Sequence, residues 1–153
     1  MSTARWLTNT EQRDWRSFVT VCALLPERLE TDLSRRHGLS LAEYDVLVHL
    51  SEAPDRRMRM SDLANAVLAS RSRLSHQITR MERDGLVKRQ ECESDRRGWL
   101  AVLTDEGMHR LQLAAPDHVE SARSNVLDQL SDEEFTELGR LCRKIGSHLH
   151  TVR

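Results

Sequence analysis

The stretch from Met60 to Thr104 places the strongest constraint on how this chain can fold. It reads MSDLANAVLASRSRLSHQITRMERDGLVKRQECESDRRGWLAVLT. Its pattern predicts a short helix, a tight turn, a longer helix and then two strands joined by a basic tip. This order is typical of a helix-turn-helix followed by a β-hairpin wing. We therefore expect the rest of the chain to be a frame that holds this stretch.

Apolar residues in the short helix recur at helical spacing and predict a buried stripe. They are Met60, Leu63, Ala64, Val67 and Leu68. We expect Ser61 to cap this helix, and Ala69 and Ser70 to form a turn without glycine. Ser70 is then the predicted cap of the longer helix, which ends at Gly85.

The longer helix has an apolar inner face, Leu74, Ile78 and Met81, and a polar face opposite. An α-helix fits the major groove of DNA, where short hydroxyls allow close approach and arginines can bind guanine edges or phosphates. The positive end of the helix at Ser70 can also hold a phosphate. The candidate DNA-binding residues here are Ser70, Arg71, Ser72, Arg73, Ser75, His76, Thr79, Arg80 and Arg83.

The predicted wing consists of strands from 86 to 92 and from 99 to 103, with a polar tip from 93 to 98. An arginine at such a tip can enter the minor groove, where the negative potential is strong. We assign that role to Arg97, with Asp95 pairing to it, and a phosphate contact to Arg96. A basic helix or a basic hairpin alone is usually ordinary solvated surface; the two together favour DNA binding.

The charge distribution supports a local polyanion contact. The whole chain has a formal net charge of −1, with 23 Lys and Arg against 24 Asp and Glu. Residues 56–100 contain 11 Lys and Arg against 6 Asp and Glu, a net charge of +5, which leaves 12 against 18, a net of −6, for the remainder. An acidic frame around a basic centre predicts that DNA is contacted only at the centre.

Two amphipathic helices are predicted at the ends of the chain. The first is capped by Thr8 or Thr10 and runs to about Arg36 before Gly38; Pro26 suggests one kinked helix or, less favourably, two shorter ones. The last follows a capping box from Ser131 to Glu134. Their apolar steps of 3, 4, 3, 4 indicate seams for helix pairing. The seams are Trp15, Phe18, Cys22, Leu25 and Leu29, and Phe135, Leu138, Cys142, Ile145 and Leu149.

Such seams predict a homodimer, because a winged helix alone does not need them. The alternative is that they close a bundle within one chain. Between them, Ser40 and Glu43 predict a capping box for a helix ending before Pro54, followed by a very short strand near Met58. Thr104 is the predicted cap of a long helix that contains Pro116.

The stretch from 41 to 104 resembles the winged helix of MarR-type transcription regulators. The resembling segments are LAEYDVLVHL, MSDLANAVLASRSRLSHQITRMERDGLVKR and DRRGWLAVLTDEG. The wing pattern of Asp-x-Arg, then Leu-Thr and a glycine, matches Asp95, Arg97, Leu103, Thr104 and Gly107. The resemblance covers nearly the whole chain.

The resemblance implies a mainly α fold with a small β-wing, in which a winged helix-turn-helix core (40–104) is flanked by dimerisation helices (9–37 and 105–150). The whole of 1–153 is then one domain. It also implies a homodimer that binds palindromic double-stranded DNA as a regulator, most often a repressor. A two-fold dimer predicts half-sites roughly 10 bp apart. Many members are released by small phenolic or aromatic-acid ligands, or by oxidation.

A ligand site is expected where the frame meets the winged helix, with Arg16 or His49 as the cation. The candidate lining residues are Trp15, Arg16, Phe18, Val19, Tyr44, Leu47 and His49. These residues are equally consistent with ordinary core. A redox site at Cys22 is the less favoured alternative to a buried structural cysteine, and the chain has a single tyrosine, unlike the paired tyrosines of peroxide-sensing relatives. Cys92 is expected in a wing strand with possible exposure, and Cys142 in the last seam.

Other classes of function find little support in the sequence. No metal or other cofactor is expected, because the three cysteines are widely spaced and no Cys/His/carboxylate cluster is complete. No enzyme motif is present. A winged helix used for protein interaction, without a specific DNA site, is the alternative function. We expect no membrane association and a cytoplasmic location, because no apolar run approaches a membrane span.

Overall fold

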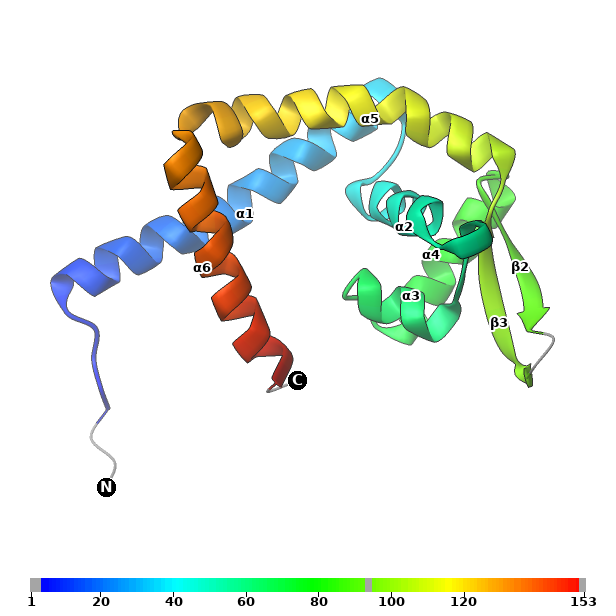
Figure 1. Cartoon of the computed structure of the whole chain (residues 1–153), viewed down its shortest axis with the longest axis horizontal. Helices are drawn as coiled ribbons and strands as arrows, with labels where there is room; N and C mark the ends of the chain where they lie inside the picture. The colour runs from blue at the N-terminus through cyan, green and yellow to red at the C-terminus, as the bar shows by residue number, and fades with distance from the viewer. Residues whose placement is uncertain (1–3, 93–94, 152–153) are drawn as a thin grey trace.

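The computed structural model describes residues 4–92 and 95–151, with the side chains of 95–97 outside the described part. Helix α5 (Asp105–Asn125) spans the molecule. The winged helix lies at one end of α5, and α6 (Asp132–Thr151) lies at the other end, as Figure 1 shows. Helix α1 (Asn9–His37) packs against α5. A 3-10 turn, η2 (Leu127–Gln129), joins α5 to α6.

The predicted helix boundaries of the frame are confirmed. Thr8 caps α1 with Glu11 in a capping box, and Pro26 lies inside one helix. Gly38 ends α1 at a φ of 63° and donates its N–H to the Ser34 carbonyl. This left-handed position favours glycine, which explains why the helix stops there.

The other predicted capping boxes also form. Helix α2 (Leu41–Glu52) starts with the reciprocal hydrogen bonds of Ser40 and Glu43. Ser131 and Glu134 make the same exchange before α6. A 3-10 turn, η1 (Pro54–Arg56), follows α2, and the short strand expected near Met58 is β1 (Arg57–Arg59).

The sheet has the strand order β1-β3-β2, with both pairs antiparallel. Strand β2 covers Val87–Cys92 and β3 covers Asp95–Leu103. The prediction that 93–98 form the tip was therefore wrong for its second half, because β3 already starts at Asp95. Backbone pairing extends the hairpin despite the polar composition, with an irregular register between Glu91 and Cys92. Residues 93 and 94 lie outside the described residues.

The first helix of the helix-turn-helix is shorter than predicted. Helix α3 spans Met60–Ala66; Arg59 stands at its N-cap position, so Ser61 is not the cap. Arg59 still belongs to β1, and the helix starts directly after the strand. Val67 and Leu68 leave the helix, and Leu68 adopts a positive φ of 54° with 60% of its surface exposed. A turn without glycine thus places a leucine in the left-handed region.

The core is centred on the winged helix and extends to Leu33 of α1 and to Leu111 and Ala114 of α5. It joins α2, α3, α4 and the sheet, and its fully buried side chains include Val46, Leu47, Leu50, Leu63, Leu74, Ile78 and Met81. Helix α4 (Arg71–Arg83) presents the expected inner face to this core. Burying each such aliphatic side chain contributes about 1.5–3 kcal/mol.

The wing is fixed to α5 at Thr104 and Gly107. The Thr104 hydroxyl caps α5 by accepting the Gly107 N–H at 3.0 Å, and lies 2.7 Å from the Gly85 carbonyl oxygen. A Cβ on Gly107 would meet the Leu86 carbonyl oxygen at 2.1 Å. Glycine is therefore required here by close backbone approach, which explains the Thr and Gly of the predicted motif.

Most of the two apolar seams remains uncovered in a single chain, although Leu25 and Leu29 are partly buried. In α6, none of the residues is buried. In α1, Leu33 is the buried residue, whereas Trp15 is 56% exposed. The alternative in which the seams close a bundle within one chain is therefore wrong.

Candidate nucleic-acid interface

Helix α4 has the two faces that the sequence predicts. The Ser70 hydroxyl accepts the Arg73 N–H at 3.2 Å and caps the helix. The residues on its outer face are exposed: Arg71, Ser72, Arg73, Ser75, His76, Thr79, Arg80 and Arg83. Gln77, which the sequence analysis did not single out, is buried on the inner side, and its Nε2 has no hydrogen-bond partner among the described residues.

Arg89 of β2 joins the wing to α4. Its N–H donates to Glu82 Oε1 at 2.8 Å, and its Nη1 donates to Glu82 Oε2. Its Nη2 donates to the Ser75 carbonyl oxygen at 2.8 Å and reaches the hydroxyls of Ser75 and Thr79. Sequence reasoning missed Arg89, because a single arginine in a polar strand gives no sign of its partners.

A groove of about 410 Å³ lies between the wing and α4. Its walls combine guanidinium groups, hydroxyls and an indole ring. The lining residues are Arg59, Met60, Ser61, Arg71, Ser75, Arg89, Gly98 and Trp99. Three arginines beside a helix that exposes further cations make this side of the molecule suitable for a polyanion. Of these residues, the sequence analysis had assigned only Arg71 and Ser75 to DNA.

The three predicted wing residues Asp95, Arg96 and Arg97 open strand β3. Their side chains lie outside the described residues. The wing backbone lies beside α4, as expected, because β2 packs against that helix. The contacts of these three side chains stay predictions.

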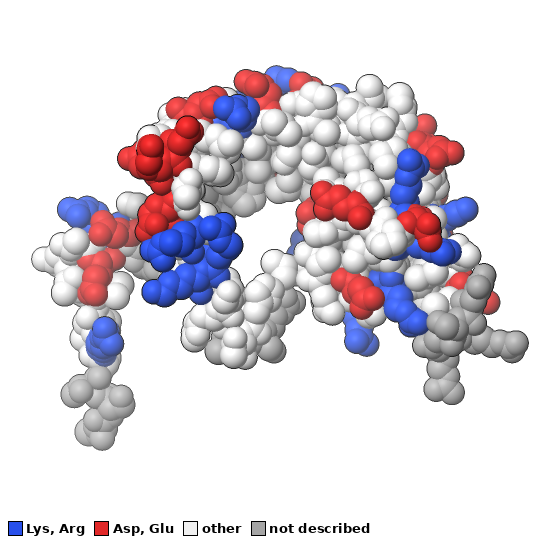
Figure 2. All heavy atoms as spheres, viewed as in Figure 1, with Lys and Arg blue, Asp and Glu red and all other residues white. Residues whose placement is uncertain are grey.

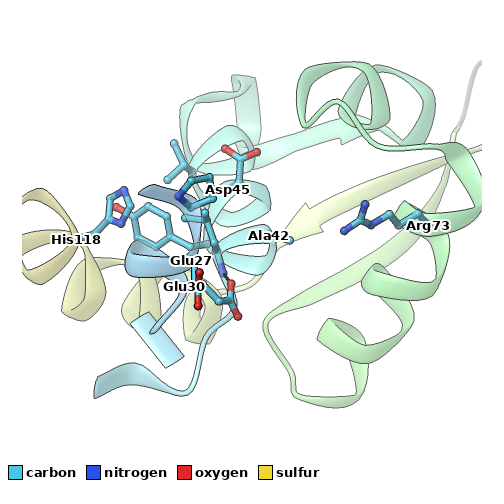
Figure 3. A pocket seen from close by; sticks show the side chains of 10 residues that line it. Glu27, Glu30, Ala42, Asp45, Arg73 and His118 are labelled. Atoms are coloured by element: carbon cyan, nitrogen blue, oxygen red, sulfur yellow. Dashed lines mark hydrogen bonds between the residues drawn. The ribbon is translucent and has the colours of Figure 1, made fainter. Parts of the chain in front are cut away.

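A second and larger groove, of about 890 Å³, lies between α1, α2, α5 and the start of α4. In Figure 3, His118 and Arg73 lie at opposite ends, with Glu27, Glu30 and Ala42 between them. The ring centroids of Tyr44 and His118 are 4.3 Å apart. Burial lowers the pKa of His118 and raises the pKa of Tyr44. Nδ1 of His118 has no hydrogen-bond partner in the described part.

The predicted ligand residues do not come together in one chain. Among them only Tyr44 lines the larger groove, and Arg73 is the arginine that lines it. Leu47 is fully buried in the core, and His49 lies 3.6 Å from Asp45 on α2. The remaining four lie on the exposed first half of α1: Trp15, Arg16, Phe18 and Val19. The sequence could not reveal this, because helical spacing shows a face but not which elements cross it.

The cysteines are also placed differently from the sequence expectation. Cys22 and Cys142 are exposed in the single chain, whereas Cys92 is buried in β2. Cys92 lies five residues after the buried Val87, so simple alternation along β2 does not explain its burial; the register is irregular between Glu91 and Cys92. Among residues 4–92 and 95–151, no cluster of three or more His, Cys, Asp or Glu side chains is arranged for a metal ion. None of the helices in the described ranges is long and apolar enough to cross a membrane.

A helix-turn-helix with a polar outer face, a wing beside it and a basic groove between them defines the class of winged-helix DNA-binding proteins. Sequence comparison agrees. A profile of the MarR family matches residues 37–98. The regulator PecS of Dickeya dadantii, described as an HTH-type transcriptional regulator, is 33% identical over 83% of this chain and 76% of its own length.

Solved structures extend the likeness to the whole chain. AbsC, a MarR family transcriptional regulator from Streptomyces coelicolor, is 51% identical, with a TM-score of 0.93 over 97% of this chain and 99% of its own. Sco3205 of the same organism and family, crystallised with DNA, is 42% identical, with a TM-score of 0.94 over 97% and 93% of the two chains. This chain belongs to the MarR family of DNA-binding transcriptional regulators, which are not enzymes.

Proposed function

We propose that the protein is a homodimeric repressor that binds a palindromic operator through α4 and the wing of each subunit. Two features carry the proposal: the outer face of α4 is exposed and basic, and most of the apolar seams of α1 and α6 is uncovered in the single chain. The first supplies DNA contacts, and the second supplies the surface that pairs two copies. We assign 40–104 to DNA binding and 9–37 with 105–150 to dimerisation.

Pairing of the seams sets the distance between two recognition helices. A two-fold dimer reads two half-sites roughly 10 bp apart, so its operator has matching symmetry. A dimer bound across a promoter excludes the polymerase, which favours repression over activation. Because MarR-family relatives regulate transcription, DNA is a better partner for α4 than a protein surface is.

The test is binding to the DNA upstream of the protein's own coding sequence. In a gel-shift titration, we expect the dimer to bind one palindromic site and to keep binding it at salt that removes non-specific complexes. A reporter driven by that site is expected to be silenced when the protein is present. Only salt-sensitive binding without a preferred site would contradict sequence-specific recognition and favour the protein-interaction alternative.

Two variants of the wing separate its groove contact from its phosphate contact. Arg97→Ala is expected to weaken operator binding about 10- to 100-fold while the dimer stays intact. Arg96→Ala is expected mainly to lower the salt dependence. Arg35→Ala at the exposed end of α1 is the control that removes the same charge. Wild-type affinity of Arg97→Ala at matched salt would show that the wing assignment is wrong.

The larger groove supports a second candidate function, release from DNA by a small aromatic ligand. Arg73 lies on the exposed side of α4 and also lines the groove, at the opposite end from His118, whose ring is in tilted contact with that of Tyr44. A phenolic or aromatic acid that stacks on these rings and pairs with Arg73 would compete with DNA for that guanidinium.

Salicylate and related benzoates are suitable probes of this second function. We expect these acids to release the protein from its operator only when Arg73 is present. Arg73→Lys should therefore lose the response, and Arg80→Lys should keep it. No effect of any such acid on operator binding at millimolar concentration would contradict this ligand class. Exposed Cys22 and Cys142 leave oxidation as the alternative trigger, which peroxide treatment of the Cys22→Ser variant would distinguish.

A further inference from the structure

We propose that Arg89 is a specificity-determining positioning residue, which fixes how the hydroxyls of Ser75 and Thr79 can face DNA bases. The inference rests on the proposed function of α4 as the reading helix. It goes further by assigning hydrogen-bond directions to two of the reading side chains and by naming the wing residue that sets them.

Glu82 anchors Arg89 at the free edge of the sheet. Among the described residues, strand β2 is an edge strand and pairs only with β3. The Arg89 N–H therefore points away from β3 and donates to Glu82 Oε1 at 2.8 Å, while Nη1 donates to the other carboxylate oxygen. One carboxylate of α4 thus holds both the backbone and the side chain of one wing residue. The arginine side chain is 21% exposed and that of Glu82 32%, so the pair is shielded from much of the solvent.

The other arm of the guanidinium lies along the outer face of α4. Nη2 donates to the Ser75 carbonyl oxygen at 2.8 Å, and it lies 3.1 Å from Thr79 Oγ1 and 3.3 Å from Ser75 Oγ. The Thr79 hydroxyl in turn donates to the Ser75 carbonyl oxygen at 3.0 Å. Both hydroxyl oxygens are therefore acceptors for Arg89.

These contacts decide what each side chain can offer to a base. The Thr79 hydroxyl donates its hydrogen within the protein. Its methyl group is then the part left to face a base, and it suits contact with a thymine methyl group. Ser75 receives an N–H at its oxygen, and its own hydrogen is directed to an acceptor. Major-groove acceptors are guanine N7 and O6, adenine N7 and thymine O4. Arg89 thus biases Ser75 toward donation and Thr79 toward apolar contact.

The planar fork of arginine is essential to this arrangement. One guanidinium spans Glu82 on one side and Ser75 with Thr79 on the other, because its N–H groups point in fixed directions. A lysine keeps the positive charge and hence the attraction to phosphates. Its single ammonium group cannot serve both sides at once, so Arg89→Lys separates positioning from charge.

The experiment selects binding sites from a randomised double-stranded DNA pool with the full-length protein. Wild type is expected to enrich one palindrome, and Arg89→Lys to lose about tenfold in the preference at the base pairs read by Ser75 and Thr79, with an unchanged salt slope. Arg57→Lys is the matched control, because Arg57 lies in β1 and pairs with Asp55. The control is expected to select the wild-type sequence with the wild-type preference.

A double-mutant cycle tests whether Arg89 acts through Ser75. In the Ser75→Ala background, Arg89→Lys is expected to change the preference at the Ser75 base pair much less than in wild type. Thr79→Val, which keeps a methyl group and loses the hydroxyl, is expected to keep the preference for thymine. Circular dichroism and sedimentation confirm that each variant is folded and dimeric.

Two outcomes would overturn the inference and leave the proposed function standing. One is an unchanged preference in folded Arg89→Lys, and the other is full additivity in the cycle with Ser75→Ala. Failure of the proposed function looks different, because wild type itself would then enrich no sequence at all.

Discussion

Helices α4 and α6 carry similar apolar stripes but differ in what covers them. In α4, Leu74, Ile78 and Met81 are fully buried within the chain, and the polar face is the one left exposed. In α6, Leu138 and Ile145 are still 39% and 47% exposed. The winged helix is therefore complete within one chain, whereas the frame is not.

The surface view agrees with this contrast. Figure 2 shows open space beneath α5, between α6 and the winged helix. Along α6, large apolar side chains are exposed, among them Leu141 and Leu149; such a surface is unfavourable in water and indicates a contact with another chain. The winged helix is stabilised by burial within one chain, whereas the apolar stripe of α6 needs a second chain. Mutations in α4 and in α6 should therefore have separable effects.

The largest expected effect is loss of the dimer. Leu138→Asp places a charge in the α6 stripe, and burial of that carboxylate against a partner is strongly unfavourable. We expect monomers in sedimentation velocity and a loss of operator affinity of more than about 100-fold, because one half-site replaces two. Thr136→Asp, exposed on the same helix but outside the stripe, is the control. If Leu138→Asp stayed dimeric, the assignment of α6 to the dimer interface would be wrong.

The second prediction concerns the α4 stripe. Leu74→Ala is expected to lower the free energy of unfolding by about 2–5 kcal/mol, because it removes buried methyl groups and leaves a cavity. Thermal or urea unfolding checks this. The loss should be the same at every protein concentration, whereas destabilisation by Leu149→Ala in α6 acts through dimer affinity and should shrink toward zero as dilution dissociates the wild-type dimer as well. Equal concentration dependence for both variants would contradict the division between the two regions.

A smaller effect is expected at the crossing of α1 and α5. The Ser121 hydroxyl donates to Asp32 at 2.6 Å and lowers the pKa of that carboxyl group. A lowered pKa means that the stabilisation is present above the ordinary value of 3.8 and disappears as pH falls through the folded-state value. Ser121→Ala should therefore reduce the Tm modestly at pH 7, and the difference from wild type should shrink at acidic pH below about 4.

Ser124→Ala on the same helix is the control for Ser121→Ala. Its hydroxyl contacts only the Ser121 carbonyl oxygen, at 3.3 Å, among the described residues, and it is exposed. If the Tm difference between Ser121→Ala and wild type did not change with pH, the hydrogen bond from Ser121 would not depend on the ionisation of Asp32.

Local signals predicted most of the fold. Capping residues such as Ser40 and Thr104 fix helix starts through their own neighbours, and the stripe of Leu74, Ile78 and Met81 has a period that identifies its buried face. The prediction from sequence was wrong where backbone conformation or pairing does not follow side-chain preference. Leu68 takes a left-handed turn, and β3 extends to Asp95 through pairing with β2.

The candidate site was only partly predictable for a related reason. The outer face of α4 follows from helical geometry alone. The bridge from Arg89 to Glu82 and Ser75 joins two elements whose relative position depends on tertiary packing. The groove beside Tyr44 likewise needs His118 from α5 and Arg73 from α4, which no spacing along the chain brings together.

The smallest expected effect lies where the frame meets the winged helix, at the tilted ring contact of Tyr44 and His118. Burial lowers the pKa of His118 below its ordinary value of 6.5. The unfolded chain therefore takes up a proton more readily, and stability should fall as pH decreases from about 7 through 6.5 toward the folded-state value.

His118→Phe keeps a ring against Tyr44 without a titrating group. Urea unfolding between pH 8 and pH 5 should show wild type losing stability relative to this variant as the pH falls. His109→Phe, at an exposed position of α5, should follow wild type. A parallel decline in wild type and His118→Phe would mean that this joint between frame and winged helix is insensitive to protonation.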